Sequence, residues 1–154
     1  MRLRNCWILL ALGVAALSAQ MSPNLTLAPV PTVKATKGAT ATITIQAHLP
    51  AGFHANSNKP TETYLIPLSL KWAEGPLTTE TVEYPKGTME KYSFSDKPLS
   101  VVTGDFSITT KFRVPASSVA GPASETGTLR YQACNDHACF PPKNVPVNVT
   151  VSVE

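Results

Sequence analysis

Apolar and polar side chains alternate residue by residue over several segments of this chain. A period of two places alternate side chains on opposite faces of a strand, so the alternation predicts β-strands with one buried face. The predicted strands are 39–48, 64–72, 77–84, 105–114, 126–133 and 144–154, of which 77–84 carries the weakest pattern. In 144–154 five valines fall on one face, which makes this the clearest prediction.

The same alternation predicts which side chains face the core. Those expected inside are Ala41, Ile43, Ile45, Ala47, Ile66, Leu68, Leu70, Trp72, Phe106, Ile108, Phe112, Leu129, Tyr131 and Ala133. Pro67 cannot donate a hydrogen bond to a neighbouring strand, so 64–72 is expected at a sheet edge or a bulge. The proline-rich segment up to about residue 36 is likewise expected to pair only as an edge strand. After the first nineteen residues no segment has apolar side chains at the three-to-four-residue spacing of a helix. The expected fold class is therefore all-β, an immunoglobulin-like antiparallel β-sandwich.

The first nineteen residues carry a different pattern. Arg2 and Arg4 precede an apolar run over 6–17, and the small residues Ser18 and Ala19 follow. This arrangement is typical of a secretory signal peptide, which is removed on export. We therefore expect residues 1–19 to be a signal peptide and 20–154 to form one exported domain, periplasmic or otherwise outside the cytoplasm. In such an oxidising compartment a cysteine pair can form a disulfide.

Length, charge and motifs narrow the function classes. The chain has 154 residues, and about 135 remain after removal of 1–19, which suits one domain. The net charge of +3 falls to about +1 without Arg2 and Arg4, so nothing in the charge indicates nucleic acid or an anionic membrane as a partner. No Ser-His-Asp order, glycine-rich phosphate loop or paired-carboxylate motif stands out. The sequence motifs therefore give no support for a hydrolase or a nucleotide-binding function.

The stretch YQACNDHACFPP, residues 131–142, holds the two cysteines expected in the exported chain, Cys134 and Cys139. Four residues separate them, and Asn135 and Asp136 favour a turn, so a hairpin with the cysteines facing each other is the simplest local structure. Opposed residues in a hairpin have Cα atoms about 4.5 to 5.5 Å apart, a separation that a disulfide tolerates. The prolines after Phe140 then end the pairing.

A disulfide that closes so short a loop stabilises the fold only slightly. A closed loop of about six residues removes only about 2 kcal/mol of chain entropy, against about 4.7 kcal/mol for a loop of about a hundred residues. The spacing therefore favours a bond that opens and closes in thiol-disulfide exchange. The alternative is a structural disulfide in a secreted, non-enzymatic binding module.

Neighbouring groups leave the chemistry of the cysteines open. A protonated His137 would favour a thiolate, whereas Asp136 would oppose it. Cys134, Cys139 and His137 are also ligands that suit copper(I) or zinc, which makes a copper-handling domain a third hypothesis. It is the least favoured, because a fourth ligand such as His48 or His54 would have to come from elsewhere in the fold. We assign no metal and no cofactor.

The cysteine stretch and the valine-rich segment after it resemble the active-site hairpin and last strand of the N-terminal periplasmic domain of the thiol:disulfide interchange protein DsbD. The segments GFHANSNKP (52–60) and YPKGTMEKYSF (84–94) are similar to two further segments of that family, in the same order. This resemblance implies an immunoglobulin-like sandwich that passes reducing equivalents between periplasmic proteins without a bound cofactor.

The resemblance also implies roles for individual residues. Cys139 would form the mixed disulfide with a partner, and Cys134 would resolve it. Phe94, together with Tyr92, would belong to a cap that shields the sulfurs until a partner displaces it; the alternative for Phe94 is an ordinary core aromatic. The residues expected to flank the site are Tyr131, His137, Phe140 and Pro141.

The implied partners are proteins that exchange disulfides. The family's domain is reduced by a thioredoxin-like domain, which a membrane-embedded domain supplies with electrons. It then reduces periplasmic disulfide isomerases or cytochrome c maturation proteins. No membrane domain and no second thioredoxin-like domain follow Glu154 in this sequence, so we expect either that these modules are separate proteins, including any membrane electron-transfer partner, or that this domain is a stand-alone adaptor.

Overall fold

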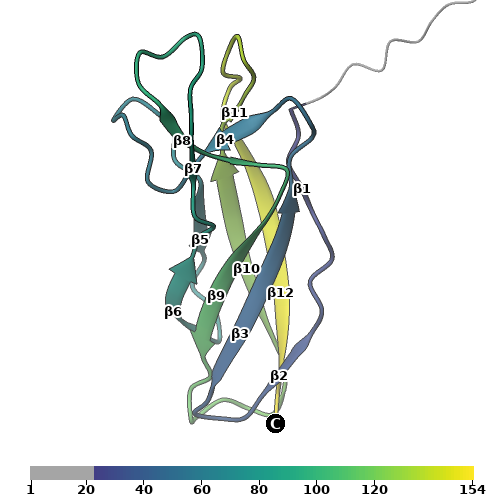
Figure 1. Ribbon diagram of the computed structural model, residues 1–154. Helices are drawn as coiled ribbons and strands as arrows, with labels where there is room; N and C mark the ends of the chain where they lie inside the picture. Colours follow the sequence, from purple (N-terminus) through teal and green to yellow (C-terminus); the bar gives the residue numbers. More distant parts are fainter. Residues whose placement is uncertain (1–22) are drawn as a thin grey trace, which may run out of the picture.

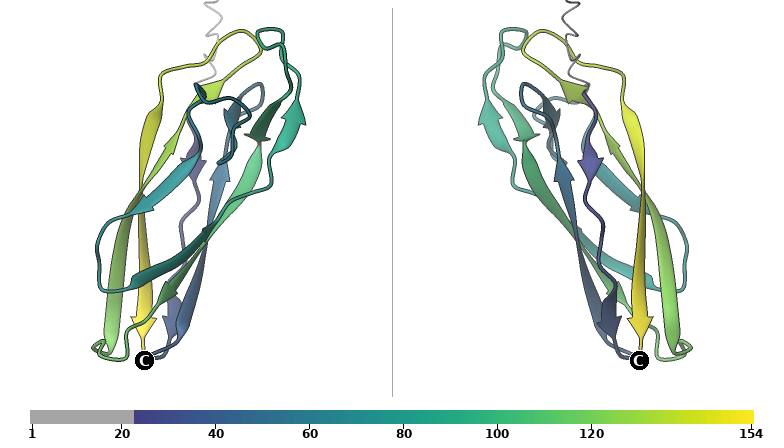
Figure 2. Two further views of the ribbon diagram at one scale, coloured as in Figure 1. Left: turned by 90° about the vertical axis from the view of Figure 1, so that its left-hand side faces the viewer. Right: turned by 90° about the vertical axis from the view of Figure 1, so that its right-hand side faces the viewer.

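The computed structural model describes residues 23–154, and the predicted signal peptide lies outside this range (Figure 1). The described residues form twelve strands arranged in three four-stranded sheets. Two sheets of long strands face each other, and a smaller sheet lies at one end of them (Figure 1). In Figure 2 the yellow β12 and light-green β10 lie on one side of this sandwich and the blue β3 lies on the other. The expected all-β, immunoglobulin-like sandwich is therefore confirmed.

Each sheet has its own order of strands. The first sheet runs β1 (Thr26–Leu27), β3 (Thr40–His48), β9 (Asp105–Arg113), β6 (Thr78–Glu83). The second runs β2 (Val33–Ala35), β12 (Lys143–Val153), β10 (Gly121–Tyr131), β5 (Ser69–Trp72). The third and smaller sheet runs β11 (Ala133–Cys134), β4 (His54–Asn56), β8 (Leu99–Thr103), β7 (Thr88–Glu90). Neighbouring strands are antiparallel except β2 and β12, which are parallel. Both strands of the proline-rich N-terminal segment, β1 and β2, lie at sheet edges as predicted.

The core lies between the two long sheets. The predicted inward faces of β3, β9, β10 and β12 are buried, and Ile45, Ile108 and Leu129 are inaccessible to solvent. Burial of one such side chain stabilises a fold by about 1.5 to 3 kcal/mol. The edge of the Trp72 ring meets the Phe112 ring, with centroids 4.9 Å apart, so the two sheets are also joined by aromatic packing. Alternation therefore predicted the core correctly where strands are long.

The predicted strand 64–72 is wrong over its first half. Regular pairing begins only at Ser69, in β5. Before it, Pro67 has no N–H to donate, and the Leu68 N–H donates to the carbonyl oxygen of Ser57 rather than to a sheet neighbour. The apolar side chains of this segment thus follow an irregular backbone. Ile66, expected in the core, is only half-buried.

The predicted long connections 50–63 and 85–98 are not plain loops. They contain β4 and β7, which pair with β8, a strand that the sequence pattern did not predict. All three residues of β4 are buried and all three of β7 are exposed, so neither shows an alternation. These short strands build the third sheet at the end of the sandwich.

The last residue of β10, Tyr131, ties the N-terminal segment to this end. Its buried hydroxyl accepts a hydrogen bond from the Leu25 N–H at 2.9 Å and donates to the carbonyl oxygen of Pro23 at 3.3 Å. Pro23 therefore lies at the same end of the sandwich as the third sheet. Within residues 23–154, no helix has the length and apolar character needed to cross a membrane.

One buried carboxylate makes stability depend on pH. Glu125 of β10 accepts the Leu77 N–H at 2.7 Å, and burial raises the pKa of its carboxyl although this hydrogen bond lowers it. A raised pKa in the folded state means that its contribution to stability is full below the unfolded pKa and is lost as pH rises through the folded pKa. We expect Glu125→Gln to raise the free energy of unfolding at pH 7 and to lose this advantage near pH 4, as measured by urea unfolding.

The control for this prediction is Glu90→Gln, a change of the same type at an exposed position of β7. It should change stability little at either pH. An advantage of Glu125→Gln that is equal at both pH values would contradict the proposed cost of ionising this carboxyl.

Candidate functional site

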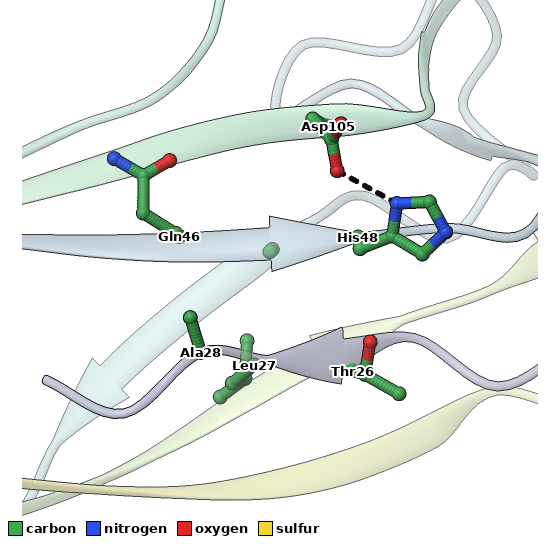
Figure 3. A pocket seen from close by; sticks show the side chains of 7 residues that line it. Thr26, Leu27, Ala28, Gln46, His48 and Asp105 are labelled. Carbon is green, nitrogen blue, oxygen red and sulfur yellow. Dashed lines mark hydrogen bonds and ion pairs between the residues drawn. The ribbon is translucent and has the colours of Figure 1, made fainter.

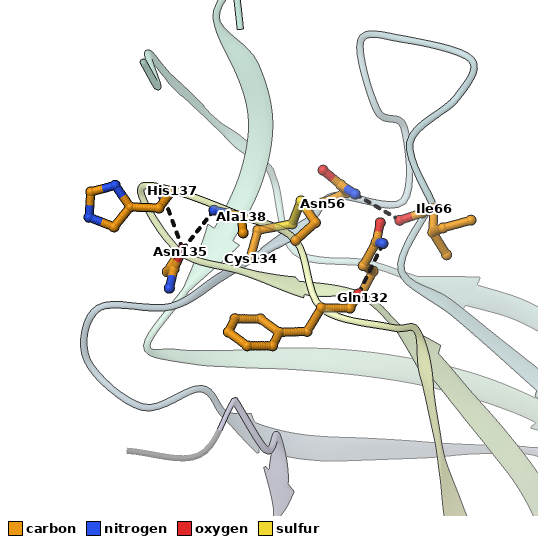
Figure 4. Close-up of a disulfide and its surroundings, with 9 residues drawn as sticks. Asn56, Ile66, Gln132, Cys134, Asn135, His137 and Ala138 are labelled. Carbon is orange, nitrogen blue, oxygen red and sulfur yellow. Dashed lines mark hydrogen bonds between the residues drawn. A yellow bond between two sulfur atoms is a disulfide. The ribbon is translucent and has the colours of Figure 1, made fainter. Parts of the chain in front are cut away.

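The predicted hairpin and its disulfide are observed at the end of the sandwich (Figure 4). Cys134 ends β11, and Cys139 pairs opposite it through an isolated antiparallel bridge. Their Cα atoms are 3.9 Å apart, closer than the predicted 4.5 to 5.5 Å. The disulfide therefore joins two positions that backbone pairing already brings together.

Asn135 shapes the turn between the cysteines. Its side-chain oxygen Oδ1 accepts the N–H groups of His137 at 2.9 Å and Ala138 at 2.8 Å (Figure 4). Its own N–H donates to the carbonyl oxygen of Ala138 at 2.9 Å. An asparagine side chain that bonds the backbone two residues on is a common turn device. The turn leaves Asp136 and His137 exposed.

The two cysteines differ strongly in exposure. Cys134 is 1% exposed, whereas Cys139 is exposed on the turn. A sulfur must be accessible before a second protein can attack it or be attacked by it. The hairpin therefore exposes one of its two cysteines and buries the other.

A loop between β7 and β8 lies against the cysteine hairpin. Ser93 of this loop donates a hydrogen bond from Oγ to the carbonyl oxygen of Asp136 at 3.2 Å. The neighbouring ring of Tyr92 packs on a small apolar cluster of Leu65, Leu99 and Val101. Phe94, 42% exposed, lies with its ring centroid 5.4 Å from that of Tyr92. The structure thus brings the predicted cap residues next to the hairpin.

His54 lies directly beside the disulfide. It pairs opposite Cys134 across β4 and β11, is 2% exposed, and its ring stacks on Tyr92 with centroids 4.0 Å apart. Burial lowers the pKa of the imidazole, and the nearby Asp136 carboxylate opposes this effect. Burial also raises the pKa of Tyr92 to about 12, with smaller contributions from Glu90 and Asp136, so the phenol stays protonated.

Sequence reasoning considered His54 only as a distant candidate ligand. The pairing of β4 with β11 places it at the site. The one indication in the sequence was that His54 follows Phe53 in the segment 52–60. This position does not tell which strand His54 pairs with, or in what register.

The predicted flanking residues occupy different positions. Phe140 packs edge-on against Phe53, with centroids 5.8 Å apart, and its carbonyl oxygen accepts Gln132 Nε2 at 3.1 Å. Pro141 is exposed after it, and the His137 side chain is exposed on the turn. Tyr131 is buried in the core. Of the predicted flanking residues, Phe140 and Pro141 are therefore the two that border the exit of the hairpin.

A separate surface pocket lies along β1 and β3, lined by residues that include Thr26 and Gln46 (Figure 3). Its His48 Nδ1 lies at hydrogen-bond distance, 2.7 Å, from Asp105 Oδ1, and both side chains are largely exposed. His48 is therefore engaged on the first sheet. Among residues 23–154, no group of three or more His, Cys, Asp or Glu side chains is arranged to hold a metal ion.

A β-sandwich that carries a disulfide of unequal exposure at one end has the features of a thiol-disulfide exchange domain. The family model for the N-terminal part of the thiol:disulfide interchange protein DsbD matches residues 25–150. The chain belongs to this family.

Two solved structures are similar in fold. The N-terminal domain of Neisseria meningitidis DsbD in the reduced form has a TM-score of 0.50 and 16% identity, over 75% of this chain and 82% of that one. The N-terminal periplasmic domain of ScsB from Proteus mirabilis has a TM-score of 0.53 and 9% identity, over 80% of this chain and 43% of that one. At these identities the likeness concerns the fold alone. A comparison with curated protein sequences finds no match.

Proposed function

We propose that this protein is an exported thiol-disulfide exchange domain that passes reducing equivalents through a reversible Cys134–Cys139 disulfide. The observation that carries the proposal is the unequal exposure of the two cysteines within one short hairpin. An exchange protein needs one sulfur that a partner can reach and a second, close by, that resolves the mixed disulfide. Membership of the DsbD N-terminal family supports this function.

The exposed Cys139 is the residue that reacts with the partner. Its thiolate attacks one sulfur of the partner's disulfide, forms a mixed disulfide and releases the other partner sulfur as a thiolate. Cys134, once deprotonated, then attacks the Cys139 sulfur and releases the second partner thiolate. Two electrons pass from the dithiol to the partner, and the two thiol protons leave with them through solvent and nearby groups. Reduction of this domain by a thioredoxin-like protein is the reverse sequence.

Tyr92 and Phe94 form a cap over the exchange hairpin that a partner displaces. The hydrogen bond from Ser93 to Asp136 and the stacking of Tyr92 on His54 hold the cap in place. One hydrogen bond contributes only about 0.5 to 1.5 kcal/mol, so a protein partner that forms its own contacts can open the cap. A small oxidant gains no such contacts and meets the closed form, in which Cys134 is buried although Cys139 is exposed.

The partners we propose are thioredoxin-like proteins or domains on one side, and periplasmic disulfide isomerases or cytochrome c maturation proteins on the other. A membrane electron-transfer protein would supply the electrons. The periplasm is the proposed location, in keeping with the periplasmic ScsB domain of similar fold. The two sulfurs suffice for the chemistry, and the domain uses no cofactor.

The midpoint potential of the cysteine couple tests this function. The purified protein is equilibrated in graded dithiol and disulfide buffers, and free thiols are counted. We expect a value between about −180 and −270 mV, the range of exchange proteins. A value below about −300 mV would mark a structural bridge and favour the binding module with a fixed loop.

A further inference from the structure

Two polar side-chain atoms of β4 are buried without a hydrogen-bond partner among the described residues. They are Nε2 of His54 and Oδ1 of Asn56. Asn56 lies beside the disulfide and donates its Nδ2 to the carbonyl oxygen of Ile66 at 3.0 Å (Figure 4). Buried polar atoms nearly always have partners, so such an atom beside a reactive bond needs an explanation.

The register of the third sheet explains why Nε2 of His54 has no partner. His54 and Cys134 are directly opposed in an antiparallel pair, so their side chains project from the same face of the sheet. The Cβ atoms of such a pair lie about 4.5 to 5.5 Å apart, which places the imidazole within reach of the sulfur. A disulfide sulfur carries no proton, whereas a reduced Cys134 carries an S–H group. Reduction therefore creates the donor that a neutral imidazole nitrogen lacks in the oxidised state.

We propose that His54 is the general base for Cys134, accepting the thiol proton at Nε2 when Cys134 resolves the mixed disulfide. This inference rests on the proposed exchange function. In the resolving step the Cys134 S–H proton moves to Nε2, and the sulfur attacks Cys139. The Cys134–Cys139 bond forms, the bond from Cys139 to the partner breaks, and the partner sulfur leaves with the electron pair. The imidazolium then returns its proton to solvent or to the departing thiolate.

Burial makes a base necessary at this position. Cys134 is 1% exposed, so once it is reduced, solvent water has little access to its thiol proton. Cys139 is exposed and can lose its proton to water directly. Cys134 therefore needs a base to remove its proton and Cys139 does not, and His54 lies opposite Cys134.

The groups around the ring suit a base. The cap contributes the phenol of Tyr92, which stays protonated, β8 contributes Thr103 opposite His54, and the hairpin contributes the Asp136 carboxylate. Burial lowers the pKa of His54, so its ring is neutral at neutral pH. Asp136 favours the imidazolium once it forms. The ring also lines a surface pocket with Tyr92 and Asp136, through which the proton can leave.

Reaction of the reduced protein with dithionitrobenzoate separates the two steps. The first coloured thiolate released reports the attack by Cys139, and the second reports the resolution by Cys134. In His54→Phe, whose ring can still stack on Tyr92, we expect the first phase to be unchanged. The second phase should slow about 100-fold at neutral pH, the lower end of ordinary general-base contributions. In the variant the rate of the second phase should also rise steadily with pH. In the unmodified protein this rate should reach a plateau above the pKa of His54.

The matched control is His48→Phe, the same substitution on β3, which should leave both phases unchanged. A second phase in His54→Phe with the rate and pH profile of the unmodified protein would overturn the role of His54. Failure of the exchange function would show instead as a midpoint potential below the range of exchange proteins, whatever the two phases do.

Two further measurements guard against a variant that does not fold. His54→Gln keeps a polar side chain but has no basic nitrogen, and the same loss of the second phase is expected. In the unmodified protein, the nitrogen resonance of His54 Nε2 should shift to that of a hydrogen-bond acceptor on reduction. A resonance that is identical in the oxidised and reduced states would overturn the proposal without any substitution.

Discussion

Cys139→Ala abolishes the covalent complex with a thioredoxin-like domain, whereas Cys134→Ala accumulates it: this is the largest effect we expect. Cys139 is exposed and forms the bond to the partner, while Cys134 is buried and acts only after that bond exists. Without Cys134 this chain has no thiol that resolves the mixed disulfide, which therefore persists when the partner has no second cysteine either. Each reduced variant is mixed with a thioredoxin-like domain that keeps one cysteine, activated as its mixed disulfide with thionitrobenzoate, and the complex is measured by mass spectrometry without reductant.

Two outcomes of that experiment are informative beyond the expected one. Equal trapping by both variants would contradict the assignment of different roles to the two sulfurs. Trapping by Cys139→Ala alone would mean that the cap and hairpin open far enough for a partner to reach the buried sulfur. The variant without either cysteine is the control, because any complex that it forms is not a disulfide of this hairpin.

The second large effect concerns stability. Phe112 of β9 is inaccessible to solvent and packs against Trp72, whose Nε1 donates to Thr110 Oγ1 at 3.1 Å. Truncation of a buried phenylalanine to alanine removes its apolar contacts and leaves a cavity. We expect Phe112→Ala to lower the free energy of unfolding by about 3 to 5 kcal/mol, measured by urea unfolding. Since domains of this size are stable by only about 5 to 15 kcal/mol, the variant should be close to unfolding at physiological temperature.

Phe94→Ala is the matched control for this substitution. Phe94 is 42% exposed on the cap, so its loss should cost less than about 1 kcal/mol. The same variant should react faster with small oxidants when reduced, because the incomplete cap would shield the buried Cys134 less well. A loss of stability as large as that of Phe112→Ala would identify Phe94 as a core aromatic and contradict its role in the cap.

The long strands could be predicted because each has one face on the core and one on solvent. In β3 and β12 this geometry requires alternation, and the alternation is visible in the sequence without knowledge of the fold. The hairpin was predictable for a similar reason. The spacing of Cys134 and Cys139 and the turn preference of Asn135 are local properties, and local structure satisfies both.

The third sheet could not be predicted because its pattern is not local. β4 is covered on both faces, and β7 is exposed throughout, so a period of two is absent from both. Their pairing depends on segments that are far apart in the chain, such as His54 with Thr103 and with Cys134. For this reason His54 was considered only as a distant candidate ligand, since the register alone places it beside the disulfide.

The two ends of the sandwich differ in a way that matters for handling the protein. Glu154 lies at the end opposite the third sheet (Figure 1), whereas Tyr131 holds Pro23 at the same end as the disulfide. A resin, electrode or fluorophore attached at Glu154 therefore stands away from Cys139 by the length of β12. Attachment just ahead of Pro23 brings the label beside the reactive end, where it can obstruct docking. Binding kinetics measured with the two kinds of tether should differ, and those from the Glu154 tether report the unobstructed encounter.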